Sequence, residues 1–354
     1  IERFPKGSEI RFLNDTDFLN PKNRPLLQKF SLGFHLYGGN KQVEDASGKI
    51  LSFDDFCKQD DFKRLGILRM DVDNLGQLFI HGLPAENRNF AGYATLSFAM
   101  DLFFSGYLNR IREKNEKFKN HVNIIYSGGD DIFALGRWKE TIEFAYTIRE
   151  HFREYVGGEE KISISGGIAF QPLKYPVRKS ALAAGEAEDK AKEYETPANS
   201  STNGKTPKKK KNAIVFFDEA ISWEKEAEIV IQLKNEILIL YQQDLIPKSL
   251  FHLFYTYREE QKNEQYTWCF HLFYQLRRAL DRIKTHNAFE KEQIKNTLIN
   301  LFKFALIGEY QFSIYTQKKI QVDKNRSLLL TCQALRWAEL ELKTDNKSLV
   351  KKSN

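Results

Sequence analysis

Three aspartates are the first residues in this sequence that suggest chemistry. Asp130 and Asp131 follow two glycines in YSGGDDIFAL (residues 126–135). Asp71 lies in a second polar stretch, MDVDNLGQLF (residues 70–79). Taken alone, GGDD fits an ordinary hairpin turn and DVDN fits a helix cap. Adjacent carboxylates repel each other, however, and one tends to stay protonated unless a cation lies nearby. We therefore expect a divalent metal ion where these aspartates meet.

The segments around these aspartates alternate between strand and helix patterns. Short apolar runs and alternating residues predict strands, and apolar residues spaced by three and four predict helices. The expected strands are 64–72, 121–127, 132–137, 161–170 and 213–218, and the expected helices are 89–118, 139–156 and 177–195. The order strand–helix–strand–strand–helix–strand is that of ferredoxin-like α+β folds.

This topology predicts where the aspartates lie. A right-handed crossover makes strands 64–72 and 121–127 parallel, so their carboxyl ends share one edge of the sheet. The return strand 132–137 fits between them, which brings Asp71 beside Asp130 and Asp131. We predict that all three are catalytic metal ligands. Mg²⁺ prefers oxygen ligands, and two such ions ~3.5–4 Å apart support phosphoryl transfer.

Two glycines and a polar bend are expected to contact the phosphorylated substrate. Without Cβ atoms, Gly128 and Gly129 allow close approach and positive φ. After Asp71 the bend formed by Asp73, Asn74, Leu75 and Gly76 offers backbone N–H groups to phosphates. Lys190 and Lys192 are candidates for the outer phosphates, although surface lysines are the commoner explanation.

The chain divides into three predicted regions. Residues 1–62 are turn-rich, 63–218 form the α+β domain, and 219–354 show five helical stripes without a convincing strand. Within the second region, 196–212 is polar and is expected to be a mobile loop. Its lysines 208–211 are interpreted as a solvated run, with RNA contact as the alternative. Aromatic residues of 251–274 recur at helical spacing, which predicts core rather than a base-stacking surface.

Composition narrows the class of protein. The 354 residues include 54 Lys+Arg against 47 Asp+Glu, a formal charge of +7 that suits a nucleotide or RNA partner. Three distant cysteines disfavour a disulfide framework or a zinc site, and no signal peptide or membrane-spanning run is evident. We therefore expect a cytoplasmic location. No His-Asp dipeptide occurs, which disfavours a histidine-based nuclease centre, and the first methionine, Met70, suggests a start within a longer gene product.

A family resemblance rests on four stretches taken in order. LGILRMDVDNLGQLF, YSGGDDIFAL, ISISGGIAF and AGEAEDKAKE resemble the second palm domain of the large subunit of type III CRISPR effector complexes. The III-A (Csm) form, with LRMDVDNLG and DLFFSGYLN, is the most similar, and the helical remainder is similar to that family's C-terminal domain. The resemblance covers about residues 62–218.

The resemblance implies an enzyme that converts ATP into 3′–5′ cyclic oligoadenylates. It implies two Mg²⁺ or Mn²⁺ ions on Asp71, Asp130 and Asp131, with Ser127, Gly128 and Gly129 lining the nucleotide pocket. It also implies other effector subunits, a guide RNA and an activating target RNA as partners. The signatures of the family's HD nuclease domain, first palm domain and zinc-bearing linker are not found here, and residues 1–62 are expected to be the end of that linker region. A missing N-terminal portion is therefore expected to complete the site.

Two alternatives remain at the level of sequence. The chain could be a scaffold subunit whose nucleotide site is idle, although retaining clustered charge argues against it. A diguanylate cyclase would share the hairpin turn, but that class typically places Glu-Phe after the acidic position, where Asp131-Ile132 stands here.

Overall fold

The described residues form two compact units. A computed structural model describes residues 8–13, 30–39, 41–57, 62–159, 161–195, 211–265, 267–285, 287–311 and 319–350. The first unit contains residues 63–193 and 211–218 together with the described part of 1–59. The second is built mainly from residues 219–354, as far as they are described. The domain bounds 1–62, 63–218 and 219–354 stay predictions.

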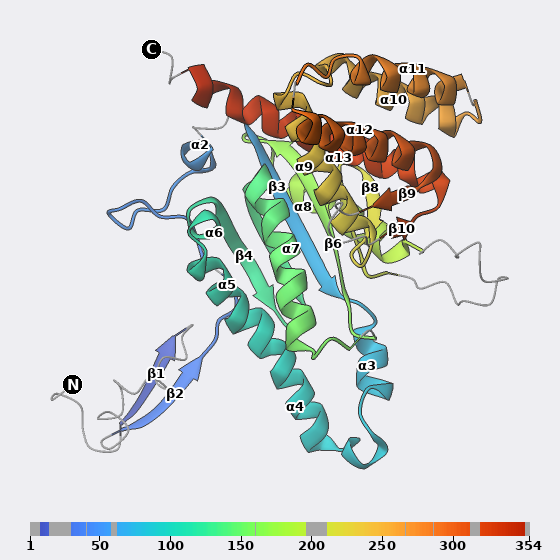
Figure 1. Cartoon of the computed structure of the whole chain (residues 1–354). Helices are drawn as coiled ribbons and strands as arrows, with labels where there is room; N and C mark the ends of the chain where they lie inside the picture. The colour runs from blue at the N-terminus through green and yellow to red at the C-terminus, as the bar shows by residue number, and fades with distance from the viewer. Residues whose placement is uncertain are drawn as a thin grey trace. The chain divides into compact units, whose positions relative to one another are not determined.

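The first unit is an α+β fold around one sheet. Within this unit the strand order is β4-β5-β3-β6-β7, with β3 antiparallel to β5 and β6 and with β6 parallel to β7. The strands are β3 (Arg64–Val72), β4 (Val122–Gly128), β5 (Asp131–Arg137), β6 (Ile164–Pro172) and β7 (Ala213–Phe216). Figure 1 shows β3 and β4 pointing the same way. The predicted ferredoxin-like order, with the return strand in the middle, is confirmed.

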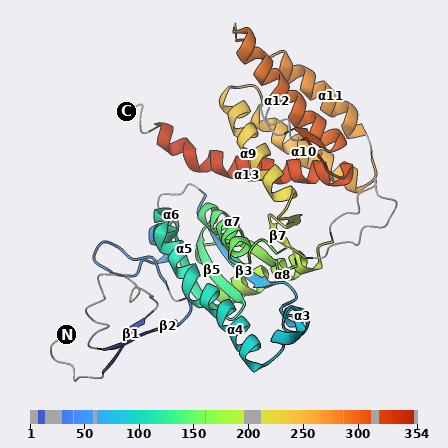
Figure 2. The same cartoon turned by 60° about the horizontal axis from the view of Figure 1, so that its bottom comes forward.

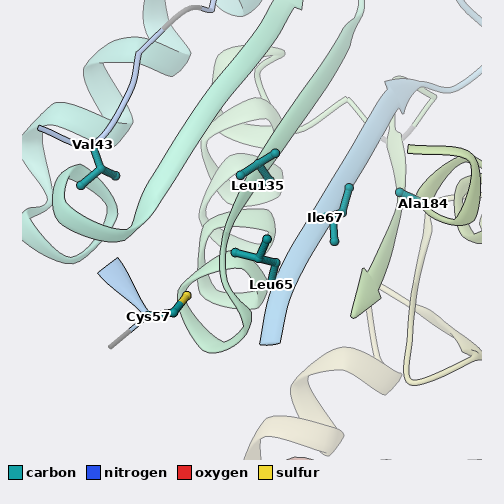
Figure 3. Close-up of a cluster of buried hydrophobic side chains, with 6 residues drawn as sticks. All are labelled: Val43, Cys57, Leu65, Ile67, Leu135 and Ala184. Atoms are coloured by element: carbon teal, nitrogen blue, oxygen red, sulfur yellow. The ribbon is translucent and has the colours of Figure 1, made fainter. Parts of the chain in front are cut away.

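Two helices cover opposite faces of this sheet: α7 (Trp138–Tyr155) and α8 (Val177–Glu193). Gly66 of β3 lies against α7, because a Cβ there would meet Thr141 at 2.7 Å. On the other face Ala184 of α8 belongs to a buried cluster with Leu65 and Ile67 (Figure 3). Successive strand residues alternate between faces, so odd-numbered residues of β3, Asp71 included, lie on the side of α8.

The predicted helix 89–118 is wrong as a single element. The structure has α4 (Phe90–Asp101), a π-helical segment (Leu102–Tyr107), α5 (Leu108–Lys114) and α6 (Glu116–His121). The break is at Asn115, whose backbone is extended and whose side chain accepts from Lys117 N at 3.0 Å. Asparagine favours such N-caps, so this residue ends one helix and starts the next.

The described residues before β3 are partly β, as expected, and one segment supports the sheet. Strands β1 (Glu9–Leu13) and β2 (Ser31–His35) pair in parallel, and a short helix α2 (Phe53–Phe56) follows. Lys41 bridges to Ile124 of β4, and Gly39 N donates to Ser127 O at 3.2 Å. This segment therefore holds the end of β4 that leads into the GGDD turn. Between β3 and α4 lie α3 (Leu75–His81) and a 3₁₀ turn (Ala85–Asn87).

The second unit is mainly helical, and all five predicted helical stripes form helices. These are α9 (Glu226–Gln242), α10 (Lys248–Lys262), α11 (Thr267–Leu280), α12 (Ala288–Ile307) and α13 (Lys324–Val350). Figure 2 shows α10, α11 and α12 lying side by side. The expectation of no strand is wrong: β8 (Glu219–Ser222), β9 (Glu309–Gln311) and β10 (Lys319–Gln321) occur. Strands of three or four residues are too short to show alternation. No described helix is both long and apolar enough to cross a bilayer.

Candidate active site

Asp71 and Asp131 face each other across the β3–β5 ladder. They are register partners, and such partners have Cα atoms about 4.5–5.5 Å apart with side chains on the same face. Asp130 lies in the turn before β5, where its carbonyl oxygen accepts from Val72 N at 3.2 Å. The structure thus brings together the three aspartates that the sequence predicts to be metal ligands.

The GGDD turn requires one glycine for its conformation and leaves one serine buried. Gly129 has φ +65°, the left-handed region, whereas Gly128 does not take a positive φ. The expectation of positive φ is therefore confirmed only for Gly129. A Cβ on Gly128 would lie 3.4 Å from Ser105 Oγ, so bulk there would press on the π-helical segment. Ser127 is buried, and its Oγ has no hydrogen-bond partner among the described residues.

The carboxylates repel one another strongly enough to shift their protonation. Burial, with added repulsion from Asp71 and Asp131, raises the pKa of Asp130 to about 6. Burial and Asp71 also raise the pKa of Asp131, although the Arg69 cation opposes this shift. The negative charge of Asp131 raises the pKa of the neighbouring Tyr126 hydroxyl, which also hydrogen-bonds to Asp131. The site therefore carries excess negative charge that a cation would neutralise.

Lys192 supplies part of that positive charge. Its ammonium group contacts Asp71 Oδ2 and lies 2.9 Å from Glu188 Oε1, one turn earlier on α8. Glu188 is buried, and its other oxygen lies 3.3 Å from Arg69 Nε. Burial disfavours the charged ammonium, but the hydrogen bonds to Asp71 and Glu188 outweigh it and raise the pKa of Lys192. Arg69, Glu188, Lys192 and Asp71 thus form a chain of alternating charges.

Gly167 allows α8 to approach the sheet closely enough for these contacts. It is the register partner of Arg69, so it lies on the same face as Asp71. A Cβ at this position would lie 2.2 Å from Glu188 N, a distance that real atoms do not reach. Glycine at 167 therefore sets how far Lys192 reaches toward Asp71.

Asp73 is only two residues from Asp71, but its carboxylate accepts hydrogen bonds from residues of other segments. Its Oδ2 accepts from Ser163 Oγ at 2.6 Å, from Ser165 Oγ at 3.0 Å and from Asn212 N at 3.0 Å. Burial nonetheless raises the pKa of Asp73, and Oδ1 has no hydrogen-bond partner among the described residues. Asn74 follows in the left-handed conformation and accepts from Lys211 Nζ at 2.7 Å. The bend therefore joins β3, β6 and the residues that precede β7.

The remaining predicted contacts lie at the edges of this arrangement. Leu75 and Gly76 form the first turn of α3, and a Cβ on Gly76 would meet open space. Lys190 Nζ donates to the backbone carbonyl of Asp218 at 3.0 Å, and its contact with the outer phosphates stays a prediction. Lysines 208–210 and the rest of 196–210 lie outside the described residues.

Comparison with known proteins identifies this region. Residues 64–200 match the family model described as Cas10/Cmr2, second palm domain. This segment is similar to the second palm domain of Cas10/Cmr2 proteins. A subtype III-A Cas10/Csm1 protein of Enterococcus italicus, named a CRISPR system single-strand-specific deoxyribonuclease, is 41% identical over 132 residues, which are 37% of this chain and 17% of that protein. The subtype III-A Cas10/Csm1 protein of Mycobacterium tuberculosis is 34% identical over 200 residues, which are 52% of this chain and 23% of that protein.

Solved structures share the fold of the palm domain and of the helical unit. A Csm1–Csm4 cassette in complex with cA4 superposes with a TM-score of 0.58 at 18% identity, covering 95% of this chain and 44% of that one. The crystal structure of Csm1 in T. onnurineus superposes with a TM-score of 0.55 at 20% identity, covering 94% of this chain and 46% of the Csm1 chain. The matched segments thus span less than half of the solved chains and under a quarter of the curated relatives. The chain is similar to part of the large subunit of a type III-A effector.

The palm aspartates suit a divalent cation, but not in their present side-chain arrangement. Among the described residues, no three His, Cys, Asp or Glu side chains are already placed to hold one ion. The fit rests on two observations. Asp71 and Asp131 face each other, and burial together with repulsion from Asp71 raises the pKa of Asp130, a repulsion that a bound cation would relieve. Metal binding would require Lys192 to yield an oxygen of Asp71. Asp71, Asp130 and Asp131 would then hold the cation.

Sequence reasoning missed four residues of this site: Arg69, Tyr126, Gly167 and Glu188. Two signals could have found the charged pair. Arg69 stands two positions before Asp71, hence on the same face of β3, and Glu188 stands four before Lys192, hence on the same face of α8. Tyr126 and Gly167 depend on packing that no local pattern reveals.

Proposed function

We propose that the chain is the cyclase part of a type III-A CRISPR effector, converting ATP into cyclic oligoadenylate. The observation that carries this proposal is the facing of Asp71 and Asp131, with Asp130 beside them, at one end of a palm sheet. The similar solved structures add support, because their names describe Csm1–Csm4 cassettes with ATP, with pppApA and with the cyclic products cA3 and cA4.

The proposed reaction joins two nucleotides. The 3′-hydroxyl of one ATP attacks the α-phosphorus of another, a P–O3′ bond forms, and pyrophosphate leaves with the electrons of the broken P–O bond. Bound Mg²⁺ or Mn²⁺ would neutralise phosphate charge and help the hydroxyl lose its proton. Asp71, Asp130 and Asp131 would hold the ions, and Lys192, on leaving Asp71, would bind the phosphates.

The other predicted nucleotide contacts are retained as part of this proposal. Ser127, Gly128 and Gly129 would border the nucleotide, and the buried Ser127 Oγ is a free donor for it. Asn74, Leu75 and Gly76 would run beside the triphosphate. Asp73 and Lys190 are retained as nucleotide contacts too, although in the structure Asp73 accepts from Ser163 Oγ and Lys190 donates to Asp218 O.

We further propose that the chain works with other protein subunits and with guide and target RNA. The similar solved structures are named for a Csm1–Csm4 pair, which supports a protein partner of the Csm4 kind. A first palm domain, expected from the resemblance, would complete the nucleotide site. Target RNA would switch the site on.

The test is product formation by the assembled complex. Supplied with ATP, Mg²⁺, guide RNA and matching target RNA, the wild-type complex should release cyclic oligoadenylate, detected by mass spectrometry. Asp130→Ala and Asp71→Ala should each abolish it, whereas the control Asp54→Ala, an exposed aspartate of α2, should not. Absence of product from the wild type as well as from the variants would refute the proposal.

One observation favours the idle-scaffold alternative, namely the Lys192 ammonium group on Asp71 where a metal would bind. An idle subunit would assemble and hold RNA without consuming ATP. Supplying GTP as the sole nucleotide tests the diguanylate alternative, for which we expect no product.

A further inference from the structure

Helix α11 exposes an aromatic and cationic surface to solvent. Phe270 is 78% exposed, Phe273 59% and Tyr274 61%, while Trp268 and Leu272 are buried on the opposite side. The expectation that aromatics of 251–274 form core is confirmed for Phe251, Phe254, Tyr257 and Trp268, but it is wrong for these three residues. Leaving three large rings in water forgoes the favourable burial that core aromatics gain.

The exposed residues share one stripe of the helix, hereafter the α11 face: Phe270, Phe273, Tyr274, Arg277 and Arg278. Their spacing of three and four residues places them on one side over about 12 Å, at 1.5 Å rise per residue. The Arg278 guanidinium lies 5.7 Å from the centre of the Tyr274 ring, within cation–π range. Arg278 therefore borders the rings, and Arg277 stands four residues after Phe273 on the same stripe.

The charge on this helix is of one sign. The sequence of α11, TWCFHLFYQLRRAL, contains no aspartate or glutamate, and His271, Arg277 and Arg278 are exposed on it. At the two ends of the helix, Glu260 accepts from Thr267 Oγ1 and Asp281 follows Leu280. A surface of rings and arginines without carboxylates complements a partner that offers flat π-faces together with negative charge.

We propose that the α11 face binds single-stranded nucleic acid. Bases stack on exposed aromatic rings and phosphates pair with arginine, a combination that tolerates any sequence. At about 3.4 Å per stacked nucleotide, the stripe accommodates two or three bases. A protein partner would also bury the rings, but the absence of carboxylates and the paired arginines favour a polyanion. This surface is independent of the palm aspartates, so the two proposals can fail separately.

The experiment measures binding of fluorescein-labelled 20-nucleotide oligo(U) and oligo(dT) to the whole chain by anisotropy. The variant Phe270→Ala/Phe273→Ala/Tyr274→Ala should bind at least about tenfold more weakly than wild type, because each stacked base contributes substantially. Arg277→Glu/Arg278→Glu should also weaken binding and should lower the slope of log affinity against log salt by about 1. The controls Phe289→Ala, an exposed ring of α12, and Lys248→Glu, an exposed lysine of α10, should bind like wild type.

A second readout needs no variant. Ultraviolet crosslinking of 4-thiouridine or 4-thiothymidine oligonucleotides to the wild-type chain, followed by peptide mass spectrometry, should place adducts at Phe270, Phe273 or Tyr274. The RNA and DNA probes show which strand the face prefers. Wild-type affinity in both α11 variants, or crosslinks confined to other segments, would overturn the proposal. Loss of effector assembly with unchanged oligonucleotide affinity would instead make this face a protein interface, and the proposal would be wrong.

Discussion

Removing the charge of Asp130 should stabilise the metal-free protein, an unusual result for a residue in a reactive site. The folded structure raises the pKa of this carboxyl from 3.8 to about 6, through burial and repulsion from Asp71 and Asp131. Folding therefore favours the protonated form. The stabilising contribution is fully present below pH 3.8 and is lost as the pH rises through 6. At pH 7.5 the ionised side chain destabilises the fold relative to a neutral amide.

The magnitude follows from the shift and from the exposure of the group. A change of about 2 pKa units corresponds to at most about 3 kcal/mol, at 1.36 kcal/mol per unit. Because the carboxyl is only partly buried, solvent screening reduces this to about 1 kcal/mol. For a domain of this size, that stability difference moves the melting temperature by about 2–4 °C. We expect Asp130→Asn to raise Tm by that amount at pH 7.5 in EDTA, with the difference shrinking toward zero at pH 4.

Scanning calorimetry at several pH values measures this directly, and magnesium supplies the matched test. Mg²⁺ should stabilise the wild type, by about 1.4 kcal/mol at ten times its dissociation constant, and should have little effect on Asp130→Asn. The control Asp189→Asn changes an exposed aspartate of α8 and should leave Tm unchanged. A metal-free Asp130→Asn protein that is no more stable than wild type at pH 7.5 would refute the electrostatic reasoning, as would equal stabilisation of both proteins by magnesium.

Three further predictions test neighbouring contacts. Lys192→Met removes the ammonium group that contacts Asp71, so Mn²⁺ alone should bind about fivefold more tightly, as measured by calorimetry, and ATP should bind more weakly. An unchanged Mn²⁺ affinity would contradict this prediction. Gly167→Ala places a Cβ 2.2 Å from the backbone nitrogen of Glu188 and should lower the free energy of unfolding in urea by about 1–3 kcal/mol. The control Gly76→Ala, whose Cβ meets open space in α3, should leave this free energy unchanged, and equal stabilities of the two variants would contradict the packing described. Burial raises the pKa of Glu236 to about 7, so the stabilising contribution of its protonated form disappears as the pH rises through 7. Glu236→Gln should therefore gain at most about 3 kcal/mol of unfolding free energy at pH 8.5 and almost none at pH 4.5. Chemical denaturation at the two pH values can confirm or exclude this pH dependence.

The palm sheet was predictable because its signals are local and its topology is constrained. Strand 64–72 was placed at its observed bounds, since an apolar run ends there at a polar bend. The hairpin of β4 and β5 follows from two apolar runs around a glycine turn. Crossover handedness then leaves one way to bring Asp71 to the turn, and the observed register agrees.

Other features depend on contacts between distant segments, which local patterns do not reveal. The role of Glu188 exists only because Gly167 lets α8 lie close to β6. Lys192 is predicted to bind phosphates, and the structure shows it on Asp71, a contact between α8 and β3 that the sequence pattern of neither element reveals. The exposed rings of α11 have the same helical spacing as core residues, so periodicity alone could not separate the two faces.

The most direct measurement is a crystal structure of the chain with its effector partners, soaked with Mn²⁺ and a non-hydrolysable ATP analogue. Anomalous scattering locates manganese without reference to the ligand. We predict manganese within bonding distance of both Asp71 and Asp131, with Lys192 moved from Asp71 to a phosphate oxygen. Manganese bound elsewhere, or Lys192 still paired with Asp71 while the nucleotide is bound, would contradict the assignment of this site to nucleotide chemistry.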